Sequence, residues 1–261
     1  MNLLVSSNSI YYMINDAQLN VLVLKSFHFD HQKTIDPLAN LRQIFREDRI
    51  LKEPFWASKI IFTTPLFTLV PTKFYDGSKR SVYFNNLTTV RPDDHFEADA
   101  LTNTQFRNVY KIDKQFIQYA NSILPMAKQY HVFTPLILGF QKMAELRSGH
   151  QVFANVRDGN LQICFFDGRD LIFANSFAFQ QAQDLIYYIM LIFEMFKLNP
   201  DTIPLSLSGS LTEDSELFKY IFRYVRHVKF IAAPTYFKFG HQFTGVPQHF
   251  YFDLFSIKLC D

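Results

Sequence analysis

The sequence has little cysteine, and the two residues it has fit no familiar site. Cys164 lies in an apolar run and Cys260 lies beside the C-terminus. This spacing is neither that of a zinc site nor that of a redox pair. We therefore expect two reduced thiols, no disulfide and no structural metal.

Neither sign of charge dominates the chain. It has 26 Lys and Arg against 24 Asp and Glu, for a formal net charge of +2 and a pI of about 8.4. A surface that neutralises a phosphate backbone needs a larger basic excess. Nucleic acid is therefore not expected as a partner.

Long hydrophobic runs are also missing. The longest apolar segment, residues 185–196, contains Glu194 and is shorter than the ~20 residues that span a bilayer, which favours a buried helix. Residues 1–14 lack the basic stretch and the sustained apolar run of a secretion signal. These features predict a cytoplasmic protein without membrane insertion.

No sharp catalytic motif appears. The chain has no P-loop, nucleophile elbow, zinc spacing or dinucleotide fingerprint. His28, Asp30 and His31 fall close together, but strand alternation places His28 and Asp30 on one face and His31 on the other, so the pair lacks a third ligand at a recognisable spacing. We therefore predict no catalytic residue and no metal ligand.

Apolar and aromatic residues are abundant. Hydrophobic residues make up 48% of the chain and aromatic residues 17%, with 30 Phe and 13 Tyr, which indicates a packed globule. Residues 236–259 are especially aromatic, and core filling is the expected role of these rings. An exposed patch of them would instead indicate a protein-docking surface.

Hydrophobic periodicity gives the same order of elements in each half of the chain. Each half predicts three strands, a helix and a fourth strand, and this repeated order indicates an internal duplication. In the first half the strands are 3–5, 9–14, 19–29 and 59–63, with a helix that opens at Asp36 and Pro37. In the second half the strands are 151–156, 161–166, 171–177 and 203–207, with a helix over 180–197.

The two halves continue differently. The second half predicts a helix capped by Thr212 or Asp214 and then a strand over 228–232. In the first half, residues 71–108 are polar and rich in turn formers, which indicates an insertion. Regular structure is expected to resume at residue 109, with a strand, a helix opening at Asp113, a short strand near 130–133 and a helix over 135–147.

A duplicated meander, helix and strand resembles the ribonuclease-H-like unit of the actin superfamily. The chain is more closely similar to a bacterial family of unknown function with an actin-like ATPase fold, on residues 3–9, Val70 and Pro71, Gly209 and residues 247–259. The resemblance implies an α/β fold of two ribonuclease-H-like units in an actin-like ATPase arrangement, with mixed five-stranded sheets flanked by helices. The expected lobes are 1–147, with an insertion at about 71–108, and 148–261.

In that superfamily, the turn after the first strand of each unit carries Asp, any residue, Gly and small hydroxyl residues. The glycine lets backbone amides approach phosphate, and the aspartate holds magnesium. Aligned on Ile10, this chain has Leu4 at the aspartate position and Ser6 at the glycine position. Three polar residues that can bond an anion remain, although an ordinary hairpin turn also explains them: Ser7, Asn8 and Ser9.

In the second unit the same alignment places Asn155 at the aspartate position and Arg157 at the glycine position, before a tight turn at Asp158 and Gly159. A guanidinium suits phosphate, but a solvated turn arginine is the commoner case. The adenosine-side motif resembles Ser208, Gly209 and Ser210. Gly209 either lets the backbone approach a purine or serves a turn that needs positive φ.

Two functions follow from these departures from the motif. The first is a catalytically degenerate actin-like protein that acts as a protein-interaction scaffold, with a protein partner and no cofactor. The alternative is a nucleotide-binding protein or weak ATPase that holds ATP and magnesium in a divergent interlobe cleft. A metabolite kinase would need a carboxylate base, for which Asp158 is the loop candidate. The residues favour no enzymatic activity, and they do not predict an oligomeric state.

Overall fold

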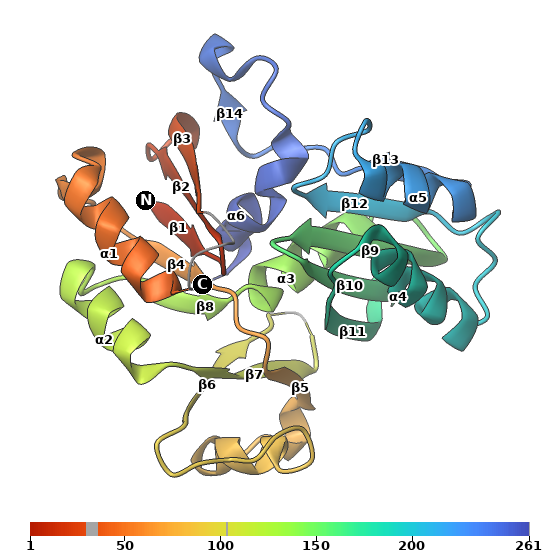
Figure 1. Cartoon of the computed structure of the whole chain (residues 1–261), viewed down its shortest axis with the longest axis horizontal. Helices are drawn as coiled ribbons and strands as arrows, with labels where there is room; N and C mark the ends of the chain where they lie inside the picture. Colours follow the sequence, from red (N-terminus) through yellow and green to blue (C-terminus); the bar gives the residue numbers. More distant parts are fainter. Residues whose placement is uncertain (30–35, 103, 261) are drawn as a thin grey trace. The chain divides into compact units, whose positions relative to one another are not determined.

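The computed structural model describes residues 1–29, 36–102 and 104–260 (Figure 1). Contacts divide the chain into two units. Unit 1 comprises Met1–Pro135 with Lys238–Gly240 and Cys260, and unit 2 comprises Leu136–Phe237 and His241–Leu259. This division falls inside helix α3 (Phe133–Ala144), and the lobes assigned from sequence at residue 147 stay a prediction.

The main sheet of unit 1 has six strands in the order β14-β3-β2-β1-β4-β8. Strands β1, β2 and β3 form the expected antiparallel meander, and β4 and β8 continue the sheet in parallel from β1. The strand from the far end of the chain, β14, pairs with β3 in parallel. The bounds are β1 Asn2–Val5, β2 Ser9–Asn15, β3 Asn20–His28, β4 Lys59–Phe62, β8 Lys128–His131 and β14 Lys238–Phe239.

Two capped helices pack on this sheet. Helix α1 (Pro37–Glu47) begins at Asp36, whose carboxylate accepts from the Ala39 amide, and α2 (Lys114–Ile123) begins at Asp113 in the same way. Leu41 and Ile44 of α1 and Ala120 of α2 join a core with the strand residues that alternation turns to this face. Both starts agree with the sequence prediction.

Residues 71–108 contain more regular structure than an insertion of turns. Strands β5 (Phe67–Pro71), β7 (Phe106–Ile112) and β6 (His95–Ala100) form an antiparallel sheet, drawn in orange to green below the main sheet in Figure 1. Helical turns at Thr72–Phe74 and Gly77–Phe84 cover it, and Phe84 packs on Phe96 with ring centroids 4.8 Å apart. The insertion therefore has a small core of its own.

Unit 2 repeats the topology. Its sheet has the order β11-β10-β9-β12-β13, with β9, β10 and β11 antiparallel and β9, β12 and β13 parallel. This matches β3-β2-β1-β4-β8 strand for strand, as the duplication predicts. The bounds are β9 His150–Arg157, β10 Asn160–Asp167, β11 Asp170–Ala178, β12 Leu205–Gly209 and β13 Val228–Phe230.

Alternation gives the unit 2 sheet two different faces. Val152, Ala154 and Val156 of β9 point toward a core shared with α4 (Ala182–Met195) and α5 (Glu216–Tyr224). Phe153 points the other way, toward Phe140 of α3, and Phe140 also stacks on Phe252 of α6 (Phe252–Ser256). Asn155 and Arg157, two and four residues after Phe153, therefore share the face that α3 and α6 cover.

Two local predictions need correction or completion. Helix α5 is capped by Ser215, whose hydroxyl accepts from the Phe218 amide, not by Thr212 or Asp214. Half of the eight aromatic residues over 236–259 fill the core, since Phe237, Tyr251, Phe252 and Phe255 are buried, and the other four are half-buried. The remaining helical turns are Ile50–Lys52, His241–Phe243, Gln248–Tyr251 and Ile257–Leu259.

Across the described ranges, no helix combines the length and apolar character needed to cross a bilayer.

Candidate functional site

The β9–β10 turn of unit 2 follows the residues that the sequence analysis aligned with the phosphate-loop motif. Asp158 and Gly159 form its two central positions, with φ of +48° and +70°. Positive φ at both positions is what a two-residue hairpin turn requires when its twist matches that of the flanking strands. The Asn160 side-chain amide donates to the Asp158 carbonyl at 3.0 Å. The turn is thus formed from local hydrogen bonds and directs Arg157, the last residue of β9, toward α6.

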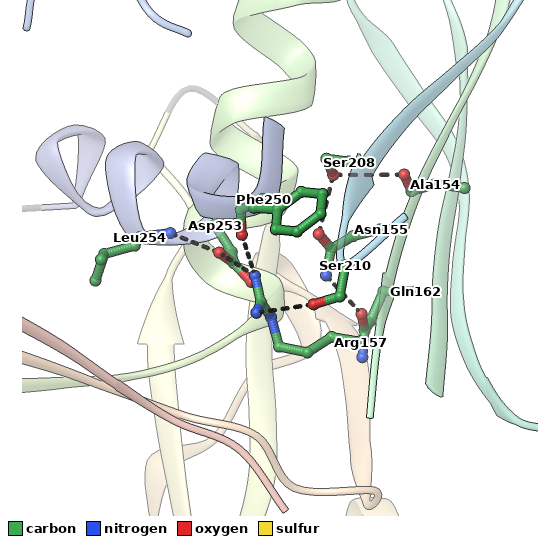
Figure 2. A network of polar contacts seen from close by, with 9 residues as sticks. All are labelled: Ala154, Asn155, Arg157, Gln162, Ser208, Ser210, Phe250, Asp253 and Leu254. Carbon is green, nitrogen blue, oxygen red and sulfur yellow. Dashed lines mark hydrogen bonds and ion pairs between the residues drawn. The ribbon is translucent and has the colours of Figure 1, made fainter. Parts of the chain in front are cut away.

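Arg157 forms a buried ion pair with Asp253 of α6 (Figure 2). Nε donates to Oδ2 at 2.9 Å and Nη2 donates to Oδ1 at 3.1 Å, which is a two-pronged pairing. Their side chains are 2% and 1% exposed. The interpretation of Arg157 as a solvated turn arginine is therefore wrong, because α6 covers it.

Further acceptors surround the same guanidinium. Nη2 also donates to the Phe250 carbonyl, and Nη1 lies 3.5 Å from the Ser210 hydroxyl. Asp253 additionally accepts from the Leu254 amide at 2.9 Å. Figure 2 shows the guanidinium enclosed by these groups. Its charge is neutralised inside unit 2 by a residue 96 positions away in the sequence.

The aspartate position of the motif carries a neutral hydrogen-bonded chain. The Asn155 side chain donates to Gln162 Oε1 at 2.9 Å and accepts from the Ser208 hydroxyl at 2.9 Å. All three residues are buried. The Asn155 side chain is a neutral amide whose donor and acceptor are both engaged by neighbours. It therefore lacks the negative charge that would hold magnesium.

Gly209 ends β12 with φ of +88° and pairs in parallel with Val156 of β9. A Cβ at this position would lie 2.1 Å from the Val156 carbonyl oxygen. The Ser210 amide also donates to that oxygen at 2.7 Å. The close approach of two backbones therefore accounts for the glycine without a purine.

In unit 1 the corresponding segment is a hairpin turn. The Ser6 amide donates to the Ser9 carbonyl at 2.9 Å. Asn8 and Ser9 are buried and Ser7 is half-buried. Leu4, at the aspartate position, is fully buried.

Three buried hydroxyls lie at the same edge of unit 1. Ser6 follows β1, and Thr63 and Thr64 follow β4, which pairs with β1 in parallel. The Thr63 amide donates to the Val5 carbonyl at 3.0 Å, so the two strand ends are adjacent. None of these three hydroxyl oxygens has a hydrogen-bond partner among the described residues. Ligands of open α/β sheets bind at this edge of the strands.

A second buried network lies in unit 1 and was not foreseen from the sequence. Asp99 of β6 accepts from the Thr134 hydroxyl at 2.6 Å, the His131 amide at 2.8 Å and the Tyr110 hydroxyl at 3.1 Å. The Asn108 side chain lies 3.1 Å from His131 Nδ1. These bonds fasten the small sheet to β8 and to the start of α3.

Burial shifts the titratable groups of this network, Asp99, His131 and Tyr110, toward their neutral forms. It raises the pKa of Asp99 to about 7, a shift that its three hydrogen bonds only reduce. It lowers the pKa of His131 to about 4. Because every Asp99 contact serves to join elements of unit 1, the network is explained by structure.

The residues that the sequence reasoning missed had faint signals. Asp253 is a lone acid within an aromatic run, which indicates a buried carboxylate. A buried carboxylate requires a cationic partner. Nothing local identifies that partner as Arg157. Among the described residues no group of three or more His, Cys, Asp or Glu could hold a metal. Asp30 and His31 lie outside them.

The repeated topology and the strand-edge geometry define a class of protein, the actin-like ATPase fold. A crystal structure from Bacteroides thetaiotaomicron, of a protein with actin-like ATPase fold and unknown function, is similar with a TM-score of 0.79. It is 23% identical and covers 88% of this chain and 89% of its own. More particularly, residues 1–228 match the family described as "Protein of unknown function (DUF3822)". The chain belongs to that family.

Two more distant structures share the fold. A chain of the PilM-PilN type IV pilus biogenesis complex has a TM-score of 0.68 at 10% identity, covering 98% of this chain and 96% of its own. The ethanolamine utilization protein EutJ from Carboxydothermus hydrogenoformans has a TM-score of 0.53 at 7% identity, covering 100% and 89%. No curated protein matches the chain in sequence.

Proposed function

We propose that this chain is a catalytically degenerate actin-like protein that acts by binding another protein. The observation that carries this proposal is the Arg157–Asp253 ion pair. A guanidinium stands at the motif's glycine position and its charge is already neutralised by Asp253. A phosphate there would have to displace a carboxylate held by two charge-assisted hydrogen bonds.

Two further observations support the proposal. Asn155 and Leu4 replace both motif aspartates, so neither position offers a carboxylate to magnesium. The fold is also found in a chain of a two-protein assembly, the pilus biogenesis complex. Protein association without nucleotide chemistry accounts for all three features.

Thermal unfolding in the presence of Mg-ATP tests the proposal. A ligand at about 5 mM with a Kd of about 10 µM would stabilise the folded chain by about 4 kcal/mol. For a protein of this size such a gain raises the Tm by about 8–16 °C, at about 2–4 °C per kcal/mol. We expect no shift beyond that of the same concentration of magnesium with sodium sulfate. A shift of several degrees specific to ATP contradicts the proposal.

The alternative function, nucleotide binding, is favoured by one observation: the hydroxyls of Ser6, Thr63 and Thr64 have no hydrogen-bond partner in the part of the chain that the structure describes. Hydroxyls can donate to phosphate oxygens, and Ser7, Asn8 and Ser9 follow directly in the chain. Under this alternative, Ser6→Ala and Thr63→Val abolish an ATP-dependent shift in Tm. Thr68→Val, on β5, is the matched control. An unchanged shift in both edge variants removes the alternative.

A further inference from the structure

Unit 1 carries a groove at the ends of its two main helices. It is lined by Arg42 and Arg46 of α1, by residues 51–58, by Tyr119 of α2 and by residues 123–127. We call it the Trp56 groove. Its volume is about 720 Å³, within the range of about 300–1,000 Å³ typical of sites that enclose a ligand. The groove is large enough to take several side chains.

Two large apolar side chains of the Trp56 groove are left in water. Trp56, the only tryptophan of the chain, is 105% exposed and Met126 is 91% exposed. A tryptophan removes about 150–250 Å² from water when enclosed. Trp and Met are enriched at protein interfaces, and Trp is one of the residue types enriched among the few that carry most of the binding energy. The exposure of both beside a concavity indicates a surface that a partner covers.

The charge of the Trp56 groove is positive. Its lining has three cationic side chains, Arg42, Arg46 and Lys52, against the single carboxylate of Glu53. The Arg42 guanidinium lies 5.3 Å from the centre of the Tyr119 ring. Neither Arg42 nor Lys52 forms an ion pair with any described residue. Arg46 pairs with Glu47 at 3.4 Å, but both side chains are largely exposed, so the pairing is weak.

From these contacts we infer that the Trp56 groove binds a protein segment that presents apolar side chains flanked by carboxylates. The apolar side chains would fill the groove and cover Trp56 and Met126. The carboxylates would pair with the guanidinium of Arg42 and the ammonium of Lys52, neither of which has an ion-pair partner among the described residues. The inference rests on the proposed function, because it names the surface through which the protein binding would occur.

Exposed tryptophan beside basic residues also suits an anionic membrane. A bilayer, however, takes up protruding side chains on a flat surface, whereas the Trp56 groove is hollowed between two helices. Concavity favours a segment over a lipid surface. Vesicle binding is therefore one outcome of the test.

The test uses two synthetic peptides of equal length that share the same Leu and Phe positions. One carries Glu at the remaining positions and the other carries Lys. Because Trp56 is the only tryptophan, its fluorescence reports occupancy of the groove directly. We expect the Glu peptide to move the emission to shorter wavelength in a saturable way, and the Lys peptide to leave it unchanged.

Variants then locate the binding by anisotropy of the fluorescein-labelled Glu peptide. Trp56→Ala is expected to weaken binding about tenfold or more, as hot-spot truncations do. The double variant Arg42→Gln/Lys52→Gln is expected to weaken it by about three- to tenfold and to reduce its salt dependence. Two matched controls lie outside the groove on exposed positions of unit 1, Phe74→Ala and Lys114→Gln, and they should leave the affinity unchanged.

Each other result overturns the inference. Equal binding of both peptides removes the charge argument, and no binding of the Glu peptide removes the groove as a site for such segments. Binding of phosphatidylglycerol vesicles that is lost in Trp56→Ala, without peptide binding, assigns the surface to lipid. The proposed function is judged separately. If neither the peptide nor Mg-ATP binds, only the inference about the groove is rejected. If both bind, only the claim that the protein works without a nucleotide is rejected.

Discussion

Removing one member of the Arg157–Asp253 pair should destabilise unit 2 strongly, and removing both should not. Arg157→Met leaves the Asp253 carboxylate buried, with the Leu254 amide as its remaining donor. Loss of one partner of a buried pair costs about 3–5 kcal/mol. Asp253→Leu strands the guanidinium and should cost a similar amount.

The double variant Arg157→Met/Asp253→Leu removes both charges from the interior. Replacement of a whole buried pair by apolar residues is often neutral or stabilising by about 1–4 kcal/mol. Here the Phe250 carbonyl also loses its donor, which costs about 1–3 kcal/mol for a buried acceptor. We therefore expect the double variant to lie within about 2 kcal/mol of the wild-type chain.

Urea unfolding followed by far-ultraviolet circular dichroism gives the free energies of unfolding. Because the chain has two units, hydrogen exchange of the β9 and β12 amides should be measured as well, since it reports on unit 2 alone. The reasoning is refuted if Arg157→Met costs less than about 1 kcal/mol. It is also refuted if the double variant is as unstable as the sum of the single ones, since contacting residues should be coupled.

Two other perturbations test the packing. Gly209→Ala should lower the free energy of unfolding by more than about 1–3 kcal/mol, the range for backbone strain alone, because an added Cβ also meets the Val156 carbonyl. The control in urea unfolding is Gly149→Ala, since Gly149 has φ of +83° and open space around it. Equal costs would contradict the close approach. Asp99 is protonated more readily in the folded chain, since burial raises its pKa from 3.8 to about 7. Its stabilising contribution is therefore full below pH 4 and lost by about pH 7, a change of about 4 kcal/mol at ~1.4 kcal/mol per pKa unit. His131 acts oppositely, because its folded pKa of about 4 removes stability as the pH falls from 6.5. Asp99→Asn should thus leave unfolding free energies that rise from pH 4 to 6.5, and a profile identical to wild type would contradict the assignment.

Local patterns sufficed to predict the order of elements in the two repeated units, although not inside residues 71–108 or at β14. Two-residue alternation marks the meanders, and Asp36 and Asp113 signal the starts of α1 and α2 because a capping carboxylate acts within three residues of its own position. The start of α5 was misplaced by a few residues because Thr212, Asp214 and Ser215 are all competent caps. The choice among them depends on where the preceding chain leaves the sheet.

Long-range pairings could not be predicted in the same way. Asp253 reaches Arg157 only because α6 covers one face of the unit 2 sheet. The strand β14 pairs with β3 although more than 200 residues separate them. Neither contact leaves a periodic signal. The motif alignment predicts that Arg157 stands at a glycine position, whereas its counter-ion, Asp253, is seen only in the tertiary structure.

The central claim is that the strand-edge chemistry of this fold no longer serves a nucleotide in this chain. Isothermal titration calorimetry of Mg-ATP into the full chain tests it most directly, with Arg157→Met/Asp253→Leu titrated alongside. The account predicts no saturable heat for either protein. Micromolar binding by the wild-type chain that disappears in the double variant would contradict it, because Arg157 would then be a phosphate ligand.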